Sequence, residues 1–287
     1  TCFTGDDTLH VIEIGIAVGY FAFKRWGGQS QAIADHVAYV LHRTNMVYSS
    51  QVHVYFTVKQ LDISDGPQKE QYDSVTDDNI TCKLNVGGHA GIYHTLEKLK
   101  TFSTQNTDVK LWHLFDDCAW NQYKTGPFIA GLAELPLQQS CNPVVGVTYI
   151  LDIFVSSPRF SFADPSHNTW TTFAHEIGHN LGAPHPFWQN SSFGGTYGGI
   201  MDYANSTLPY QTSIQNAFSE DSSAYMCKNL LYKKENCVDA LSTTATSVCG
   251  DGIVTAGEEC ECSGNNDTCA NCSKCMWLSG KSCGIGP

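Results

Sequence analysis

The chain has 287 residues, which is enough for one large domain or for one domain followed by a small module. Its 28 acidic and 16 basic residues give a net charge of −12, which argues against nucleic acid or an anionic membrane surface as a partner. Thirteen cysteines indicate an oxidising compartment, because so many thiols would be a hazard in the cytosol. We therefore expect a protein of the secretory pathway, either extracellular or at the cell surface.

The cysteines divide the chain into two parts, with six spread over the first 240 residues and seven crowded into the last 39. We predict a core-bearing domain over residues 1–240, a Ser/Thr/Ala-rich linker over 241–248 and a disulfide-held module over 249–287. The odd total indicates a partner cysteine beyond this segment, a free thiol or an intermolecular bridge. Five sequons for N-glycosylation fit a secretory route. They begin at Asn79, Asn190, Asn205, Asn266 and Asn271.

The first predicted elements are a strand, a helix and a second strand. Residues 10–23 are rich in Val, Ile and aromatic side chains, which predicts a central strand buried on both faces. This run is too short to span a bilayer, so we expect no transmembrane segment in this chain. Apolar residues at helical spacing over 29–47 predict a helix packed on the sheet. Residues 52–58 alternate as a strand does, and the phase changes near Lys59 and Gln60, where we expect a β-bulge.

The middle of the chain continues the alternation of strands and helices. Residues 62–85 are polar and turn-rich and predict a surface excursion, and a helix over 91–102 and a strand over 109–115 follow. This order predicts an α/β fold with a mostly parallel sheet. The spacing of His89, His94 and His113 does not suggest a metal site, so we interpret them as surface or packed residues.

Gly131, Leu132 and Ala133 precede an apolar run over 144–151, with Cys141 between them. A short antiparallel edge strand here could pair its free backbone groups with an extended peptide, and a plain connecting loop is the alternative. Further on, Asn168 or Thr169 can cap a helix that carries residues 173–176. Residues 218–238 predict a C-terminal helix that carries Cys227 and ends at Cys237.

Residues 175–185 read His-Glu-Ile-Gly-His-Asn-Leu-Gly-Ala-Pro-His. Positions i and i+4 share one side of a helix, so His175 and His179 can bind one zinc ion with Glu176 beside them. Gly182 allows a left-handed turn that ends the helix, and the chain then returns so that His185 reaches the same metal.

Three neutral imidazoles leave a tetrahedral zinc ion with an open position for water, which is typical of a catalytic site. Glu176 is then the natural general base: it takes the proton of the water and passes it to the leaving amine. Met201 lies 16 residues after His185 and can turn back beneath the metal, although a methionine here would most often only fill a core.

At these residues the chain resembles the metzincin metallopeptidases, whose signature is HExxHxxGxxH followed by a Met-turn. It is most similar to the ADAM (a disintegrin and metalloproteinase) or reprolysin family. A Met-turn without cysteine and the Thr1-Cys2 beginning resemble the Kuzbanian-like branch, which sheds ectodomains of cell-surface proteins. Cys-Gly-Asp-Gly at 249–252 and Gly-Glu-Glu-Cys-Glu-Cys at 257–262 are similar to the start of a disintegrin-like module.

The resemblance implies a metzincin fold: a twisted, mostly parallel five-stranded sheet with helices, the zinc helix at the floor of a cleft, and a small irregular C-terminal subdomain. It implies a zinc-dependent endopeptidase with protein or peptide substrates, including cell-surface proteins, that bind along Gly131, Leu132 and Ala133. It also implies a disulfide between Cys141 and Cys227.

Two residues depart from the family pattern. Pro186 stands where the family usually has Asp, as in serralysin-like enzymes, and Tyr203 stands where related enzymes carry a tyrosine that leans on the metal. We hypothesise that Tyr203 donates a hydrogen bond to the reaction intermediate. The alternative is a tyrosine that lines the S1′ pocket.

The tail also carries a candidate calcium site. Asp251, Glu258 and Glu261 bring three carboxylates close together in sequence, and the resemblance adds the backbone oxygens of Val248 and Ile253. A solvated acidic turn is the alternative. For the whole chain, the competing functions are an adhesion protein with a vestigial peptidase domain and a broad-specificity, serralysin-like secreted protease.

Overall fold

The computed structural model describes residues 2–3, 5, 8–67, 71–72, 75–76, 79–82, 90–117, 131–136, 140–150, 165–185, 199–201, 217–242, 268–269, 272–273 and 276–278. A five-stranded sheet forms the middle of the fold, in the order β2-β1-β5-β7-β6. Its strands are β1 (His10–Val18), β2 (Val54–Ile63), β5 (Leu111–Asp116), β6 (Gly131–Ala133) and β7 (Val144–Tyr149). All neighbouring pairs are parallel except β6 with β7, which confirms the predicted, mostly parallel sheet.

The predicted β-bulge lies between β1 and β2. Ile14 pairs with Val58 and Gly15 pairs with Gln60, so Lys59 is the extra residue that changes the phase of β2. The predicted first strand is too long, because β1 ends at Val18 and α1 (Tyr20–Arg25) follows. Apolar and aromatic residues continue across this boundary, so composition did not separate the strand from the helix.

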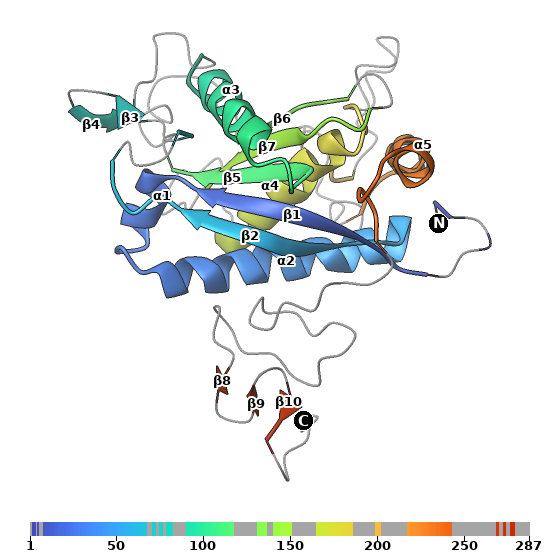
Figure 1. Ribbon diagram of the computed structural model, residues 1–287, viewed down its shortest axis with the longest axis horizontal. Helices are drawn as coiled ribbons and strands as arrows, with labels where there is room; N and C mark the ends of the chain where they lie inside the picture. The colour runs from blue at the N-terminus through green and yellow to red at the C-terminus, as the bar shows by residue number, and fades with distance from the viewer. Residues whose placement is uncertain are drawn as a thin grey trace, which may run out of the picture.

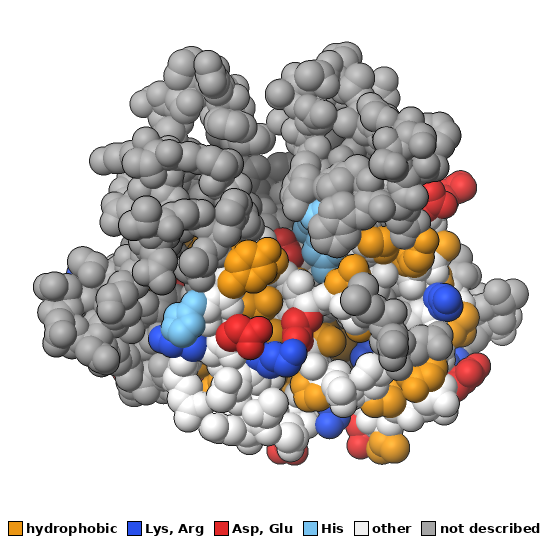
Figure 2. Space-filling model, turned by 90° about the horizontal axis from the view of Figure 1, so that it is seen from above, with side chains coloured by type: hydrophobic (Ala, Val, Ile, Leu, Met, Phe, Trp, Pro, Cys, Tyr) orange, Lys and Arg blue, Asp and Glu red, His pale blue; other side chains and the backbone are white. Residues whose placement is uncertain are grey.

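Helices cover both faces of the sheet (Figure 1). Helices α2 (Ser30–Val52) and α4 (Pro165–Asn180) share one core with β1 and β2, whereas α3 (Ala90–Gln105) packs on the opposite face. Helix α3 corresponds to the helix predicted over 91–102, and it buries Ile92, Leu96 and Leu99. The surface on the α3 side carries charged side chains of both signs beside hydrophobic ones, as Figure 2 shows. Helix α3 turns its buried apolar side chains to the sheet and its polar side chains to solvent, so it is amphipathic.

The two helices that follow the sheet differ in how well their starts were predicted. Helix α4 begins at Pro165, so the expectation that Asn168 or Thr169 caps it is wrong. Proline suits the first position of a helix, where its missing N–H has no helical partner in any case. Helix α5 (Glu220–Asn236) matches the predicted C-terminal helix: the Ser219 side chain accepts the N–H of Ser222 at its start, and Cys237 follows its end.

The remaining described strands are short. β3 (Val75–Thr76) and β4 (Asn79–Cys82) form a small antiparallel pair within the predicted surface excursion. In the tail, β8 (Thr268–Cys269), β9 (Cys272–Ser273) and β10 (Met276–Trp277) form an antiparallel sheet. Within the described part of the chain, no helix has the length and apolar character needed to cross a bilayer.

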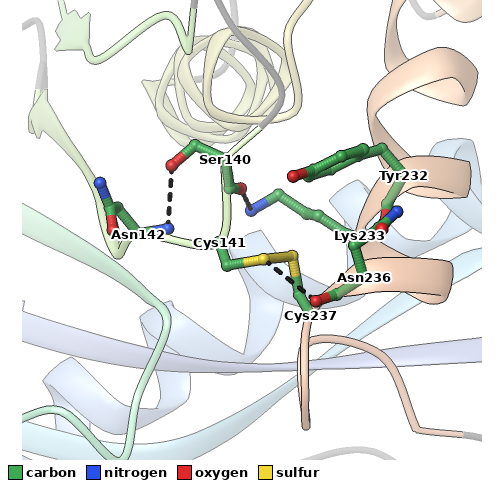
Figure 3. Close-up of a disulfide and its surroundings, with 7 residues drawn as sticks. All are labelled: Ser140, Cys141, Asn142, Tyr232, Lys233, Asn236 and Cys237. Carbon is green, nitrogen blue, oxygen red and sulfur yellow. Dashed lines mark hydrogen bonds between the residues drawn. A yellow bond between two sulfur atoms is a disulfide. The ribbon is translucent and has the colours of Figure 1, made fainter.

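Two disulfides tie α5 to distant parts of the domain, and they correct the expected pairing of Cys141 with Cys227. Cys227 bonds to Cys2, and Cys141 bonds to Cys237. The reason is position along α5: Cys141 lies beside the C-terminal end of the helix, where Cys237 is (Figure 3). Next to this disulfide, the buried Lys233 donates from Nζ to the carbonyl of Ser140 at 3.2 Å. The connection between β6 and β7 is therefore anchored to α5.

Candidate active site

The C-terminal end of α4 turns in a Schellman motif. The N–H of Gly182 donates to the carbonyl of His179 at 2.8 Å, and the N–H of Ala183 donates to the carbonyl of Gly178 at 2.9 Å. Gly182 has φ of +99°, a conformation that costs a residue with a Cβ but not glycine. The Asn229 side chain of α5 donates to the carbonyl of Leu181 at 3.0 Å and holds the turn in place. This turn directs the chain back towards α4.

The returning chain brings His185 to the two histidines of α4. The Nε2 atom of His185 lies 3.0 Å from Nε2 of His175 and 2.7 Å from Nε2 of His179. All three side chains are buried. Burial, together with the charge of His179, lowers the pKa of His175 and His185 to about 3. These rings are therefore neutral at physiological pH, as metal-binding imidazoles must be.

The outer nitrogens of two of these rings are held by backbone carbonyls. Nδ1 of His175 donates to Ile200 at 2.6 Å, and Nδ1 of His179 donates to Ala183 at 2.7 Å. A carbonyl can only accept, so each ring carries its proton on Nδ1 and presents the Nε2 lone pair inward. Three Nε2 atoms converge here, and at least two of them carry a lone pair and no proton. Such a cluster is suited to bind a cation. Three nitrogens on a tetrahedral zinc ion are about 3.3 Å apart, so small ring shifts would admit it.

Met201 lies directly under α4 and is 1% exposed. Its Sδ would be 2.5 Å from a Cβ at Gly178, so only glycine in the helix permits this contact. The N–H of the adjoining Ile200 donates to the carbonyl of Ala217, and the carbonyl of Ile200 accepts from Nδ1 of His175. Met201 thus packs against the helix that carries His175 and His179, and its neighbour Ile200 accepts the hydrogen bond from His175.

Glu176 lies beside the three histidines and is 4% exposed. Burial raises the pKa of its carboxyl well above the usual range. A bound cation would oppose this shift, because an opposite charge favours the carboxylate. Behind the helix, the Tyr48 hydroxyl donates to the carbonyl of Ala174 at 2.8 Å, and burial followed by the charge of Glu176 raises the Tyr48 pKa.

The edge strand β6 passes over the carboxylate of Glu176. A Cβ at Gly131 would lie 2.5 Å from Glu176 Oε1, so only glycine lets the strand approach the carboxylate this closely. Among the described residues, β7 is the one strand that pairs with β6, which confirms the predicted antiparallel edge strand over the alternative of a loop. The N–H of Glu134 points to β7, where it donates to Val145. By alternation, Gly131 and Ala133 direct their backbone groups to the free side.

The structure thus brings together His175, His179, His185, Glu176, Met201 and the strand Gly131–Ala133. Other predicted site residues lie outside the described residues: Pro186, Tyr203, Val248, Asp251, Ile253, Glu258 and Glu261. His94 is exposed and His113 is buried, which agrees with their interpretation as surface or packed residues. Nε2 of His113 lies 2.9 Å from the Thr148 hydroxyl. Sequence analysis missed Tyr48, Asn180 and Glu134. Their contacts join distant elements, and no local pattern signals them.

Three converging neutral imidazoles, a buried carboxylate and an adjacent edge strand define the site of a zinc metalloendopeptidase. The sequence comparisons give the same class. The model of metallopeptidase family M12 matches residues 8–222, and the chain belongs to this family.

Among curated relatives, the disintegrin and metalloproteinase domain-containing protein B of Trichophyton verrucosum is 24% identical over 96% of this chain and 36% of its own length. The protein of the same name from Aspergillus fumigatus is 22% identical over 96% of this chain and 36% of its own length. The disintegrin and metalloproteinase domain-containing protein 10 of Bos taurus is 33% identical over 40% of this chain and 16% of its own length. The chain thus spans about a third of the first of these relatives.

Proposed function

We propose that the protein hydrolyses peptide bonds of extracellular or cell-surface proteins, in the manner of ectodomain shedding, with Glu176 as the general base. The observation that carries the proposal is the convergence of three imidazole Nε2 atoms next to a buried carboxylate and a free strand edge. The two described disulfides support an oxidising compartment. The relatives' names support a protein that combines a metalloproteinase and a disintegrin domain.

His175, His179 and His185 would hold the metal. When bound, a zinc ion supplies the Lewis acidity that polarises the scissile carbonyl and makes a water molecule acidic. Glu176 accepts the proton of the attacking water and passes it to the leaving amine. Its burial helps here, because a carboxylate in a water-poor site is a stronger base than one in solution.

The edge strand would align the substrate. An extended peptide can pair with the free backbone groups of Gly131 and Ala133, which read the peptide backbone rather than its side chains. The Leu132 side chain is partly buried and packs against the core on the α3 face of the sheet. Its backbone groups alternate with those of Gly131 and Ala133 and face β7, not the free edge. This arrangement would allow peptides of varied sequence to bind next to the three histidines.

Three finer assignments belong to this proposal. Tyr203 donates a hydrogen bond to the reaction intermediate, and full kcat in Tyr203→Phe would show that it does not. Asp251, Glu258 and Glu261, with the carbonyls of Val248 and Ile253, bind calcium, which calorimetry on the full chain tests. The peptidase domain ends near residue 240, and 249–287 begin a disintegrin-like domain, so limited proteolysis should cut first within 241–248.

Hydrolysis of quenched fluorescent peptide libraries, with and without a zinc chelator, tests the main claim. We expect chelator-sensitive cleavage by the wild type. Glu176→Gln keeps the size of the side chain but cannot act as a base, so it should retain zinc and lose about 10²- to 10⁴-fold in kcat. An adhesion protein with a vestigial site would show no chelator-sensitive cleavage, and this result would refute the proposal.

A further inference from the structure

Glu134 directly follows the edge strand β6 and bonds to three separate elements. Its N–H donates to the carbonyl of Val145 in β7 at 2.9 Å, and its Oε2 accepts the N–H of Val145 at 3.2 Å. Its carbonyl accepts from Nδ2 of Asn180, at the end of α4, at 3.0 Å. Its Oε1 accepts from Nζ of Lys100 in α3.

The register of the sheet shows what is unusual about these bonds. Gly131 pairs with Thr148 and Ala133 with Gly146, so Glu134 continues this register opposite Val145. In a regular antiparallel ladder, such a pair exchanges two backbone hydrogen bonds. Here the Glu134 carboxylate takes the place of its own carbonyl, and the carbonyl turns to α4. The strand ladder therefore stops after Ala133.

Asn180 completes the connection between the edge strand and α4. It is fully buried, and its Nδ2 donates to the carbonyls of both Glu134 and Val145, at 3.0 and 2.9 Å. It also directly follows His179 in the chain. The end of the edge strand is thus tied to the helix that carries two metal ligands and Glu176.

Lys100 holds the Glu134 carboxylate from the other side of the sheet. The Lys100 side chain is 50% exposed and that of Glu134 is 22% exposed. The hydrogen bond that Lys100 donates to Glu134 is the main cause of the raised pKa of Lys100. The ion pair orients the carboxylate towards Val145, and the partly exposed lysine alone contributes little to stability.

We propose that Glu134 is a positioning residue for peptide binding: it ends β6 after Ala133 and fixes the position of the free strand edge relative to α4. The inference rests on the proposed function, because it assumes that substrates pair with β6. Without the carboxylate, the N–H of Val145 loses its acceptor and the strand end loses its link to Lys100, so that only its backbone bonds to Val145 and Asn180 remain. The strand must then be ordered each time a peptide binds.

The test compares Glu134→Ala with Glu134→Gln, using a long peptide and a truncated peptide too short to reach β6. Glu134→Ala should raise KM for the long peptide about tenfold, the equivalent of about 1.4 kcal/mol or one lost hydrogen bond. Its kcat and its KM for the truncated peptide should stay within about twofold of the wild type. Glu134→Gln should raise this KM less than Glu134→Ala does, because its amide oxygen can still accept from Val145 although the ion pair with Lys100 is lost.

A matched control removes a second Glu–Lys pair among the described residues, which joins β1 to β2 away from the site. Glu13 and Lys59 are 2.8 Å apart and 28% and 41% exposed. Glu13→Ala should leave every KM unchanged. A second readout needs no catalysis: in the zinc-free protein, hydrogen exchange at the Val145 amide should be faster in Glu134→Ala and unchanged in Glu134→Gln.

Equal KM values for Glu134→Ala and Glu13→Ala, in a wild type that cleaves both peptides, would overturn this inference and leave the proposed function intact. Failure of the wild type to cleave either peptide would overturn the proposed function, and this inference with it. A KM that rises equally for both peptides would show a general loss of structure, which also contradicts the inference.

Discussion

Gly131 and Glu176 approach so closely that one added methyl group should disturb the reaction. In Gly131→Ala, the new Cβ would lie 2.5 Å from Oε1, 2.7 Å from Cγ and 2.9 Å from Cδ of Glu176. Carbon and oxygen atoms that are not bonded stay about 3.5 Å apart, so either the carboxylate or β6 must shift by about 1 Å. Overpacking of this kind costs about 1–3 kcal/mol.

Because the base must lie near its proton, this shift should lower kcat/KM about 10- to 100-fold. The three atoms nearest to the new Cβ all belong to Glu176 and none to the three histidines, so zinc content should remain that of the wild type. The assay is peptide hydrolysis with zinc measured on the same sample, and Glu176→Gln sets the level of activity without a base. A Gly131→Ala variant with wild-type kcat/KM would refute the argument that this glycine determines where the carboxylate lies.

Three further predictions concern stability and the metal. Burial lowers the pKa of His113 to about 3, so between pH 6.5 and 3 only the unfolded chain takes up this proton, and stability falls as the pH falls. His113 alone should contribute about 2 kcal/mol to the loss of stability from pH 7 to pH 5. Urea unfolding should show it in the wild type, and an equal loss in His113→Gln would contradict it. Gly182→Ala should destabilise the protein by about 1–3 kcal/mol and weaken zinc binding, because a Cβ at φ of +99° strains the turn that delivers His185; unchanged zinc affinity by competition with a chelator would count against this role. Replacing Cys141 and Cys237 by serine opens a loop of 96 residues and should cost about 3–5 kcal/mol, and an unshifted thermal midpoint would refute that estimate.

The metal site was predictable because its determinants are local. The spacing of His175, His179 and His185, with Gly182 between them, specifies a helix, a left-handed turn and a return, and the structure has all three. The bulge at Lys59 was also visible, since an extra residue changes the phase of alternation within a single strand.

Errors arose where the outcome depends on distant parts of the chain. Composition did not show that β1 ends at Val18, because apolar residues continue into α1. Sequence position did not show that Cys141 faces Cys237 rather than Cys227, since both candidates lie on or next to α5. The role inferred for Glu134 depends on partners from three elements, α3, α4 and β7, which only the folded chain brings together.

The central claim is that three imidazoles bind one zinc ion, and X-ray absorption spectroscopy of the zinc-loaded protein tests it most directly. We predict one zinc ion per chain, with nitrogen ligands at about 2.0–2.1 Å. His185→Ala should reduce both the zinc content and the nitrogen signal. Absence of bound zinc, or sulfur ligands at about 2.3 Å that would place the metal among the cysteines of the tail, would contradict the account.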